Sequence, residues 1–428
     1  MKKLFVILLS TLLFTACFKQ NSETKETILP EVPASTVGIS QERLNRIDTL
    51  LTNAIKDHKI PGAVALIARH GNIVYHKAFG MANNASQEAL KLDHIFRIAS
   101  QSKAITSTAV MMLWEEGKFG LDDPISKYIP EFANPQLLES FNETDSSYTT
   151  KPADKQITIR NLLTHTSGIG YGQIEGDPTF KKIYAKAGIV DLFTTEHVTI
   201  ADNIKKLASL PLHHNPGEKF TYSEGLDVLG YFVEVISGMP FDVFLKTRIF
   251  DPLGMNDTQF YLPESKYNRL VTVQTKEHDK WVKYPVTFYD TDYPKTGAKQ
   301  FFSGGAGLTS TAKDYATFLE MYLNQGELNG VRLLSRTTVE TILTNQIPYI
   351  SEGIPAVHGL AFGLVDAKKH DLGGNSSEGT FEWGGYFNTQ YFADPKEDLI
   401  GILLKQTQKV NDDTGGKFRL LVNAAIAD

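Results

Sequence analysis

The sequence has almost no cysteine and no strong charge imbalance. Cys17 is the only cysteine among 428 residues, so no disulfide can form within the chain and the core has to stabilise the fold. The formal net charge is only −6, which gives no indication of nucleic-acid binding. Apolar residues make up 42% of the chain, enough for one large globular domain or two interleaved ones.

Long hydrophobic runs are also missing. The apolar run near the N-terminus, residues 4–14, is interrupted by Ser10 and Thr11. It is shorter than the roughly 20 residues that a transmembrane helix needs. Because two lysines precede it, this run predicts a secretory signal peptide over residues 1–16.

The end of this segment resembles a bacterial lipobox. In Phe14-Thr15-Ala16-Cys17 a small residue precedes the cysteine, and in that family the cysteine is lipidated and becomes the mature N-terminus. The alternative is an ordinary signal peptide with an incidental cysteine. Residues 17–36 are polar and contain proline, which is typical of a tether. We therefore expect an exported bacterial lipoprotein, anchored to a membrane through Cys17 and facing the periplasm or the cell surface.

Signals for a metal or a nucleotide are weak. His213 and His214 are adjacent, so their side chains rarely face one ion, and no third ligand stands at a recognisable spacing. The glycine-rich residues 303–308 are not followed by the Gly-Lys-Thr/Ser of a phosphate loop. They indicate close backbone packing beside a cleft instead. We expect no metal, no cofactor and no nucleic-acid partner.

What the sequence does contain is a hydroxyl and an amine three residues apart. Ser100 and Lys103 precede a helical pattern over residues 107–116, and positions i and i+3 of a helix share one face. Serine is a poor nucleophile that needs an adjacent base. A lysine can be that base only if burial or a nearby charge lowers its pKa, and the flanking apolar residues favour burial. Alone, this pattern is weak, since most such pairs lie on solvated helix faces.

The order of the predicted elements indicates the fold class. An apolar stripe of helical spacing (Leu44, Ile47, Leu51, Ile55) is followed by a strand hairpin over residues 63–79. Polar residues 134–156 are typical of an irregular surface insertion. Four further strands and a final helix occupy residues 360–427. We therefore predict an α+β fold in which both chain ends form one helix-flanked antiparallel sheet. A mostly helical lobe of about residues 104–300 is inserted, with the active site in the cleft between the lobes.

Two polar residues of the helical part have alternative interpretations. Tyr222 stands just before a helical pattern that Gly238 closes, where the positive helix end favours a phenolate. A tyrosine at such a position is ordinarily a packing residue. His165 suggests catalysis, but a histidine that holds a turn by hydrogen bonds is the simpler interpretation.

Three stretches occur in a recognisable order. They resemble the Ser-x-x-Lys, Tyr-x-Asn and Lys/His-x-Gly motifs of the serine β-lactamase and penicillin-binding-protein superfamily. The stretches are Ser100-Gln101-Ser102-Lys103, Tyr222-Ser223-Glu224 and Trp383-Gly384-Gly385. Trp-Gly-Gly in third place resembles class C-like serine hydrolases and family VIII carboxylesterases. The resemblance covers about residues 40–408 and implies one β-lactamase-like domain over residues 37–428.

The resemblance implies a role for each matching residue. Ser100 would be the acylated nucleophile, and Lys103 would help to deprotonate it. Tyr222 would pass the proton to the leaving group and later activate water. The backbone N–H groups of Ser100 and Tyr386 would form the oxyanion hole.

Two departures from the family pattern affect the expected substrate. Glu224 replaces an asparagine, and a carboxylate cannot donate a hydrogen bond and adds negative charge beside Lys103. Trp383 replaces a cation that helps to bind a substrate carboxylate, whereas an indole offers apolar surface and one N–H donor. These two residues, with Gly384 and Gly385, are the expected substrate-binding residues. Both departures favour an uncharged ester or a bulky apolar acyl group. We therefore predict an esterase-type serine hydrolase whose substrate is a small-molecule ester or amide.

Two other functions remain open at this stage. One is a weak β-lactamase or D-amino-acid peptidase acting on peptidoglycan-type substrates. The other is a non-catalytic binding lipoprotein with the same fold. The sequence leaves open the natural substrate, the oligomeric state, and which of Lys103 and Tyr222 is the base in each step.

Overall fold

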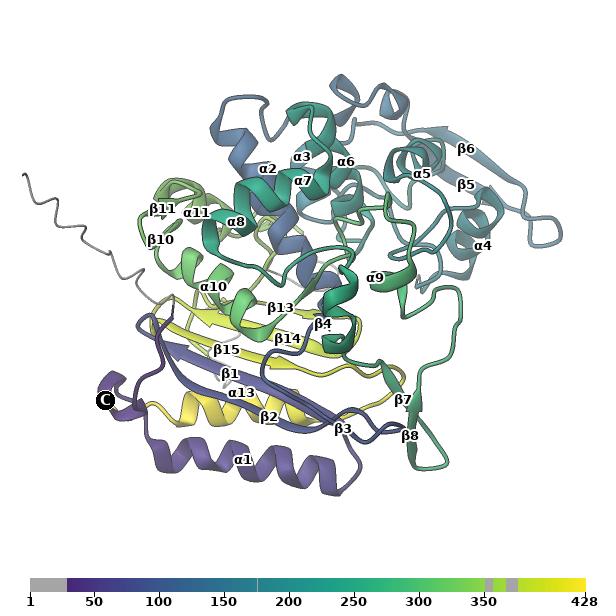
Figure 1. Cartoon of the computed structure of the whole chain (residues 1–428). Helices are drawn as coiled ribbons and strands as arrows, with labels where there is room; N and C mark the ends of the chain where they lie inside the picture. The colour runs from purple at the N-terminus through teal and green to yellow at the C-terminus, as the bar shows by residue number, and fades with distance from the viewer. Residues whose placement is uncertain (1–28, 175, 351–356, 367–375) are drawn as a thin grey trace, which may run out of the picture.

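Both ends of the chain contribute strands to one sheet. The computed structural model describes residues 29–174, 176–350, 357–366 and 376–428. Seven strands are arranged in the order β12-β13-β14-β15-β1-β2-β3, and each neighbouring pair is antiparallel (Figure 1). The strands are β1 (Gly62–Arg69), β2 (Asn72–Asn83), β3 (Glu88–Ala89), β12 (Gly363–Leu364), β13 (Phe381–Gly385), β14 (Thr389–Asp394) and β15 (Leu399–Leu404). The α+β prediction is confirmed, while the predicted signal peptide, Cys17 and residues 18–28 lie outside the described residues.

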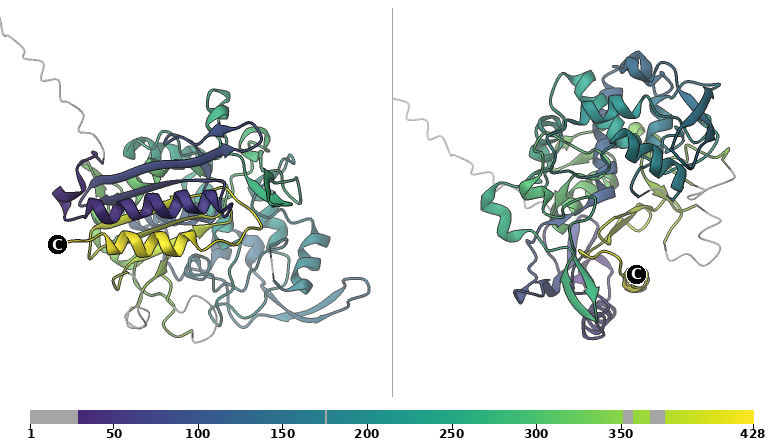
Figure 2. Two further views of the ribbon diagram at one scale, coloured as in Figure 1. Left: turned by 90° about the horizontal axis from the view of Figure 1, so that it is seen from below. Right: turned by 90° about the vertical axis from the view of Figure 1, so that its right-hand side faces the viewer.

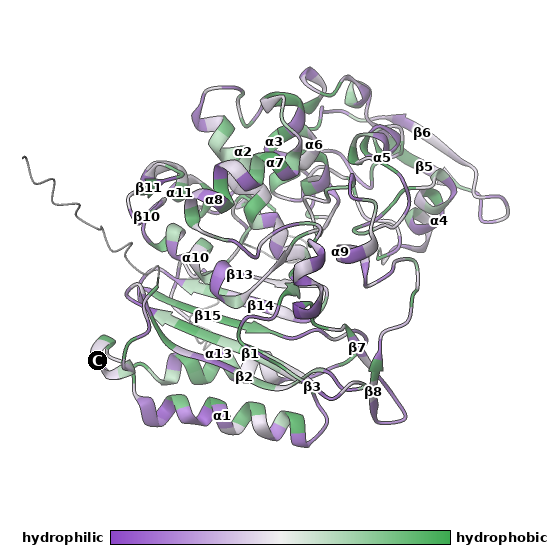
Figure 3. Ribbon diagram, in the orientation of Figure 1, coloured by the Kyte–Doolittle hydropathy of each residue, from purple (hydrophilic) through white to green (hydrophobic). Residues whose placement is uncertain are grey.

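The central strands are apolar because both faces of the sheet are covered. Every residue of β1 is buried, and so is every residue of β15. Val64 and Leu66 pack into the core on one face, and Ala65 and Ile67 into a second core on the other. Figure 3 shows these strands as predominantly hydrophobic. This alternation follows from the two-residue period of a strand.

Four helices cover the two faces of this sheet. Helices α1 (Gln41–Lys56) and α13 (Thr414–Ala424) lie side by side on one face, and α2 (Ser102–Glu115) and α10 (Ala312–Leu323) lie on the other (Figures 1 and 2). Ser40 caps α1 by accepting a hydrogen bond from the Arg43 backbone N–H. The predicted apolar stripe of α1 is buried against the sheet, since Leu44, Ile47 and Leu51 are fully covered.

The inserted lobe is mostly helical and surrounds α2. Twelve of the fourteen residues of α2 are buried, so this helix is a core element rather than an amphipathic surface helix. The other helices are α3 (Ile159–Leu163), α4 (Pro178–Ala187), α5 (Ile200–Leu207), α6 (Gly225–Ser237), α7 (Phe241–Leu245), α8 (Asp251–Leu253), α9 (Tyr293–Thr296) and α11 (Arg336–Ile342). The described residues also form three small hairpins: β5 (Gln136–Phe141) with β6 (Tyr148–Pro152), β7 (Gln274–Glu277) with β8 (Lys280–Lys283), and β10 (Glu327–Leu328) with β11 (Val331–Arg332). Two strands far apart in the sequence, β4 (Phe96–Arg97) and β9 (Thr309–Ser310), form a further antiparallel pair.

The inserted lobe contains one hairpin that the sequence did not predict. The stretch predicted to be irregular, residues 134–156, contains the hairpin β5–β6, which projects from the lobe (Figure 1).

Among the described residues no single helix is long and apolar enough to cross a membrane. The pair Gly225–Ser237 and Phe241–Leu253, bent by 81°, passes that test only when taken together.

Candidate active site

Ser100 lies at the junction between β4 and α2. A short 3₁₀ turn, η2 (Ala99–Gln101), connects them, and Ala99 adopts a left-handed backbone with φ of 44°. Such a conformation in a residue with a Cβ atom costs roughly 1–3 kcal/mol and persists only where the surroundings enforce it. The turn leaves Ser100 half-buried, with its side chain on the wall of a cleft.

The Lys103 ammonium is buried directly beside Ser100. Its side chain is 1% exposed, and Nζ lies 3.3 Å from Ser100 Oγ. Nζ also donates to the Tyr171 hydroxyl at 3.0 Å and to the Gly305 carbonyl at 2.8 Å. An ammonium has three N–H donors, and these three acceptors use all of them. Ser100 and Lys103 are therefore in contact, as their spacing predicted. Tyr171 also contacts Lys103, and the sequence did not predict this residue as part of the site.

Tyr222 completes this group from the loop before α6. Its ring centroid lies 4.6 Å from Lys103 Nζ and 5.9 Å from the centroid of the Trp383 ring. Within the described part of the chain its hydroxyl makes no hydrogen bond to protein, and the residue lines the same cleft as Ser100. A tyrosine hydroxyl left available in a cleft can exchange a proton with a bound substrate.

His165 holds the turn that carries Tyr222. It is fully buried; its Nδ1 lies 3.2 Å from the Ser223 backbone N–H donor, and its carbonyl accepts from the Thr221 N–H at 2.8 Å. Burial first, and then the nearby His358 and Lys103, lower the pKa of His165 well below its ordinary value, so the ring is neutral. These contacts agree with the turn-holding interpretation rather than with a catalytic one.

The third motif lies on β13, across the cleft from Tyr222. Trp383 and Gly384 line the cleft, and the Trp383 ring packs against His358 at a centroid distance of 5.4 Å. A Cβ atom on Gly385 would lie 2.5 Å from the Ile98 carbonyl oxygen, so only glycine lets β13 approach the Ser100 turn this closely. Tyr386, the expected second oxyanion donor, is the next residue.

The turn after β13 is braced from the segment that follows β15. Gln408 Nε2 donates to the Tyr386 carbonyl at 2.5 Å, and Asn388, at φ of 67°, donates through Nδ2 to Asp412 Oδ2 at 2.7 Å. Asp412 also pairs with Lys405 at 2.8 Å, and both side chains are only 1% exposed. The sequence reading missed this brace, because nothing local in residues 405–412 relates them to the Trp-Gly-Gly motif.

Glu224 does not reach the cleft. It is 1% exposed, its backbone N–H donates to the Gly170 carbonyl, and its carboxyl group hydrogen-bonds Asp191. Burial first, and then Asp191, raise the pKa of Glu224 well above its ordinary value. The sequence predicted a charged, substrate-binding carboxylate at this position, whereas the structure buries this carboxyl group behind the site and its pKa is raised.

A second buried acid, Asp227 on α6, holds the glycine-rich loop. Its Oδ1 accepts from Ser303 Oγ at 2.5 Å and from the Gly305 N–H at 3.2 Å. The Gly305 carbonyl is the acceptor for Lys103, so Asp227 fixes one of the three ammonium partners. The close backbone packing predicted from the glycines therefore occurs beside Lys103, where it fixes the Gly305 carbonyl.

The cleft itself is apolar near Ser100. It has a volume of about 660 Å³, and aromatic or aliphatic side chains form much of its wall. They are Phe220, Tyr222, Leu364, Trp383, Tyr391 and Phe392. At its far end the Arg419 guanidinium pairs with Glu382. Among the described residues no group of three or more His, Cys, Asp or Glu side chains is placed to hold a metal ion, and His213 stacks on Phe180.

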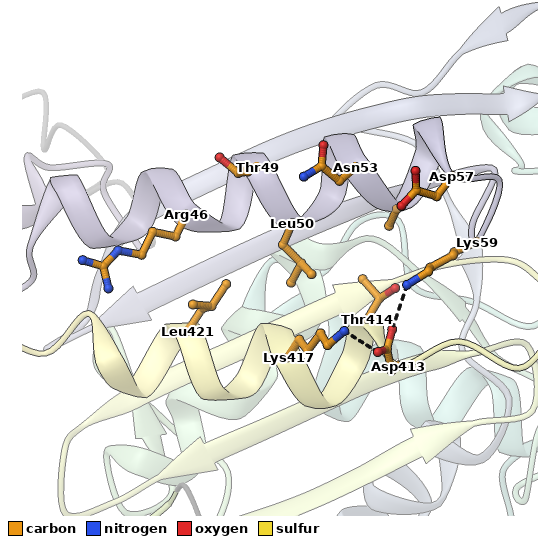
Figure 4. A pocket seen from close by; sticks show the side chains of 11 residues that line it. Arg46, Thr49, Leu50, Asn53, Asp57, Lys59, Asp413, Thr414, Lys417 and Leu421 are labelled. Carbon is orange, nitrogen blue, oxygen red and sulfur yellow. Dashed lines mark ion pairs between the residues drawn. The ribbon is translucent and has the colours of Figure 1, made fainter.

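Another hollow, of about 430 Å³, lies between α1 and α13 on the other face of the sheet (Figure 4). Lys59 and Lys417 both pair with Asp413 there. Of the described residues, neither a serine nor a cysteine lines this hollow, whereas Ser100 lines the cleft described above.

The arrangement of Ser100, Lys103 and Tyr222 on this sheet agrees with a family-level comparison. The family model named Beta-lactamase matches residues 47–426. The chain belongs to the beta-lactamase family. Esterase EstB of Burkholderia gladioli is 31% identical to this family member over 379 residues, which are 85% of this chain and 90% of EstB. The lovastatin esterase of Penicillium rubens is 28% identical over 83% of this chain and 91% of the relative.

A solved structure supports the same placement within the beta-lactamase family. EstCE1, described as a hydrolase with promiscuous acyltransferase activity, superposes with a TM-score of 0.74 at 26% sequence identity. The match covers 91% of this chain and 99% of EstCE1. The chain is thus a serine hydrolase of the branch near the family VIII esterases, as its motifs indicated.

Proposed function

We propose that this serine hydrolase is a carboxylesterase that forms an acyl-enzyme on Ser100 and prefers uncharged esters with a bulky apolar acyl group. The observation that carries the proposal is the Trp383 indole on the cleft wall, where relatives that bind a substrate carboxylate would carry a cation. The charge of Lys103 is already engaged by three acceptors, and Arg419 is paired with Glu382. A substrate carboxylate would therefore find no unpaired cation beside Ser100 among the described residues.

The proposed reaction has two halves. Ser100 Oγ attacks the ester carbonyl carbon while the N–H groups of Ser100 and Tyr386 stabilise the oxyanion, each contributing roughly 2.7–4 kcal/mol. The serine proton passes through Tyr222 to the departing alcohol. In the second half Tyr222 relays a proton from water to Ser100 Oγ while the water oxygen bonds to the acyl carbon. The bond between the acyl carbon and Oγ breaks, so the carboxylic acid leaves and the Ser100 hydroxyl is restored. We assign the proton transfer to Tyr222 because all three donors of a charged Lys103 are engaged, so that Lys103 contributes positive charge.

The proposal predicts a preference for esters over β-lactams. We expect kcat/KM for p-nitrophenyl butyrate to exceed that for nitrocefin, because nitrocefin carries a carboxylate that the cleft leaves unpaired. Trp383→His should raise the nitrocefin-to-butyrate ratio of kcat/KM by about tenfold, equivalent to one good charge-assisted contact of about 1.4 kcal/mol. Trp383→Phe, which keeps the apolar surface and adds no cation, is the matched control.

Three outcomes would favour another interpretation. Nitrocefin turnover above ester turnover in the unaltered protein would replace the esterase proposal with a β-lactamase or D-amino-acid peptidase. An unchanged ratio in Trp383→His would remove Trp383 as the reason for the preference. A protein that turns over neither substrate and does not react with a fluorophosphonate would favour a binding lipoprotein.

We also propose that the enzyme is held at a membrane by a lipid on Cys17. The support is the lipobox-like sequence and the polar residues 18–28 between Cys17 and the described fold. Metabolic labelling of the full chain with a radioactive fatty acid should mark the protein and fail to mark Cys17→Ser. Equal labelling of both forms would exclude the anchor at this residue.

A further inference from the structure

We infer that Glu224 acts as a neutral acid that donates its proton to Asp191 and thereby positions Tyr171 against Lys103. Glu224 stands where the family motif has an asparagine, and its role as a positioning residue rests on the esterase function proposed above. The site would then include two carboxyl groups that share one proton behind Lys103.

The backbone on both sides of Tyr171 is held by these two acids. On one side the Glu224 N–H donates to the Gly170 carbonyl at 3.1 Å. On the other side Asp191 accepts from the Gly172 N–H at 3.1 Å and from the Gln173 N–H. A Cβ atom on Gly172 would lie 2.9 Å from Asp191 Oδ1, so the approach is as close as glycine allows. Between these anchors the Tyr171 hydroxyl receives the Lys103 Nζ donor at 3.0 Å.

A hydrogen bond between the Glu224 and Asp191 carboxyl groups requires one of the two groups to be protonated. Glu224 is 1% exposed and Asp191 is 3% exposed, and two buried carboxylates in hydrogen-bond contact cannot both be ionised. The proton belongs on Glu224, because Asp191 already accepts two backbone N–H donors and such bonds favour the anion. Glu224 Oε1, by contrast, has no hydrogen-bond partner among the described residues. A neutral glutamic acid supplies the donor that an asparagine amide would supply.

The other charges around Glu224 act on the same proton. Asp227 on α6 raises the pKa of Glu224 further, and Lys103 on α2 lowers it, but burial is the largest effect and Asp191 the next. Tyr171 is fully buried and its pKa is raised well above the ordinary value, first by burial and then by Tyr222, so it stays protonated beside Lys103. Ionisation of Glu224 at high pH would therefore place two adjacent negative charges behind the site and loosen the segment that carries Tyr171.

The test compares variants of the full chain that differ in the donor at this position. Glu224→Gln keeps a neutral donor of the same length, whereas Glu224→Ala removes it; Glu218→Gln, at an exposed position, is the control. With p-nitrophenyl butyrate at pH 7 we expect Glu224→Gln to keep kcat within about threefold and Glu224→Ala to lose more than about tenfold, with KM little changed in both. The decline of kcat at high pH should begin at a higher pH in Glu224→Gln than in the unaltered protein.

A second measurement does not depend on activity. A carboxyl group whose pKa is raised in the folded state binds more protons there than in the unfolded state, so its contribution to stability is present at low pH and is lost as pH rises. The difference in melting temperature between Glu224→Gln and the unaltered protein should therefore shift in favour of Glu224→Gln between pH 5 and pH 8, whereas Glu218→Gln should show no such shift.

Two results would overturn the inference. One is a Glu224→Gln variant as impaired as Glu224→Ala although it is folded. The other is identical pH dependence of both kcat and melting temperature in Glu224→Gln and the unaltered protein. Absence of esterase activity in the unaltered protein would count against the proposed function instead, and the melting temperatures would still decide whether Glu224 carries the shared proton.

Discussion

Ser100→Ala is expected to reduce kcat for p-nitrophenyl butyrate by about 10³-fold or more, because it removes the serine hydroxyl that acts as the nucleophile beside Lys103. The same substitution should abolish covalent labelling by a fluorophosphonate, which reacts with activated serines. Steady-state kinetics and mass spectrometry of the labelled protein measure the two effects.

An exposed serine provides the comparison for this loss. Ser209→Ala removes a hydroxyl from the surface of the helical lobe and should keep both activity and labelling. Labelling that persists in Ser100→Ala would show that another residue is the nucleophile, and the assignment of the Ser-x-x-Lys motif would then be wrong.

Asp412→Ala should produce the largest loss of stability of any single side-chain truncation that we consider. The side chains of Asp412 and Lys405 are both 1% exposed, so removal of the carboxylate leaves the Lys405 ammonium buried without its partner. Breaking a buried ion pair in this way costs about 3–5 kcal/mol of the free energy of unfolding. Urea denaturation followed by circular dichroism measures this loss.

The neighbouring residue offers a matched control for that measurement. Asp413 carries the same side chain but pairs with Lys59 and Lys417 at the surface, and its removal should change the denaturation midpoint little. Equal midpoints for Asp412→Ala and Asp413→Ala would mean that the buried pair does not stabilise the fold. A folded Asp412→Ala protein should also lose part of its kcat, because Asn388 beside the Tyr386 turn loses one of its two acceptors and keeps only Thr407.

The sequence was sufficient for the features that depend on local spacing. The α1 stripe was predicted because burial imposes the helical period on its residues, and the β1–β2 hairpin was predicted from two apolar runs with a break between them. Ser100 and Lys103 were predicted to be adjacent because three residues of helix separate them. The hairpin β5–β6 was missed because much of it is exposed, and its side chains therefore do not alternate between apolar and polar.

The parts of the site that were not predicted depend on distant contacts. Tyr171 reaches Lys103 from 68 positions along the chain, and Asn388 meets Asp412 only because the chain turns back through β14 and β15. The charge of Glu224 was misjudged for a related reason. Its sequence neighbours do not reveal that it is buried against Asp191, and burial decides its protonation.

The pairing of β1 with β15 has a consequence for how the chain reaches its folded state. Val64 is paired with Leu404, so the central strand pair joins residues near opposite ends of the chain. Contacts of such long sequence separation slow folding, because the intervening loop must be ordered before they form. During synthesis the hydrophobic β1 could pair with β2 at once, but its other edge would stay unpaired until β15 had been made. A chain that cannot complete its sheet early remains unfolded for longer, and a truncation before residue 399, which removes β15, should leave the chain without its central strand pair.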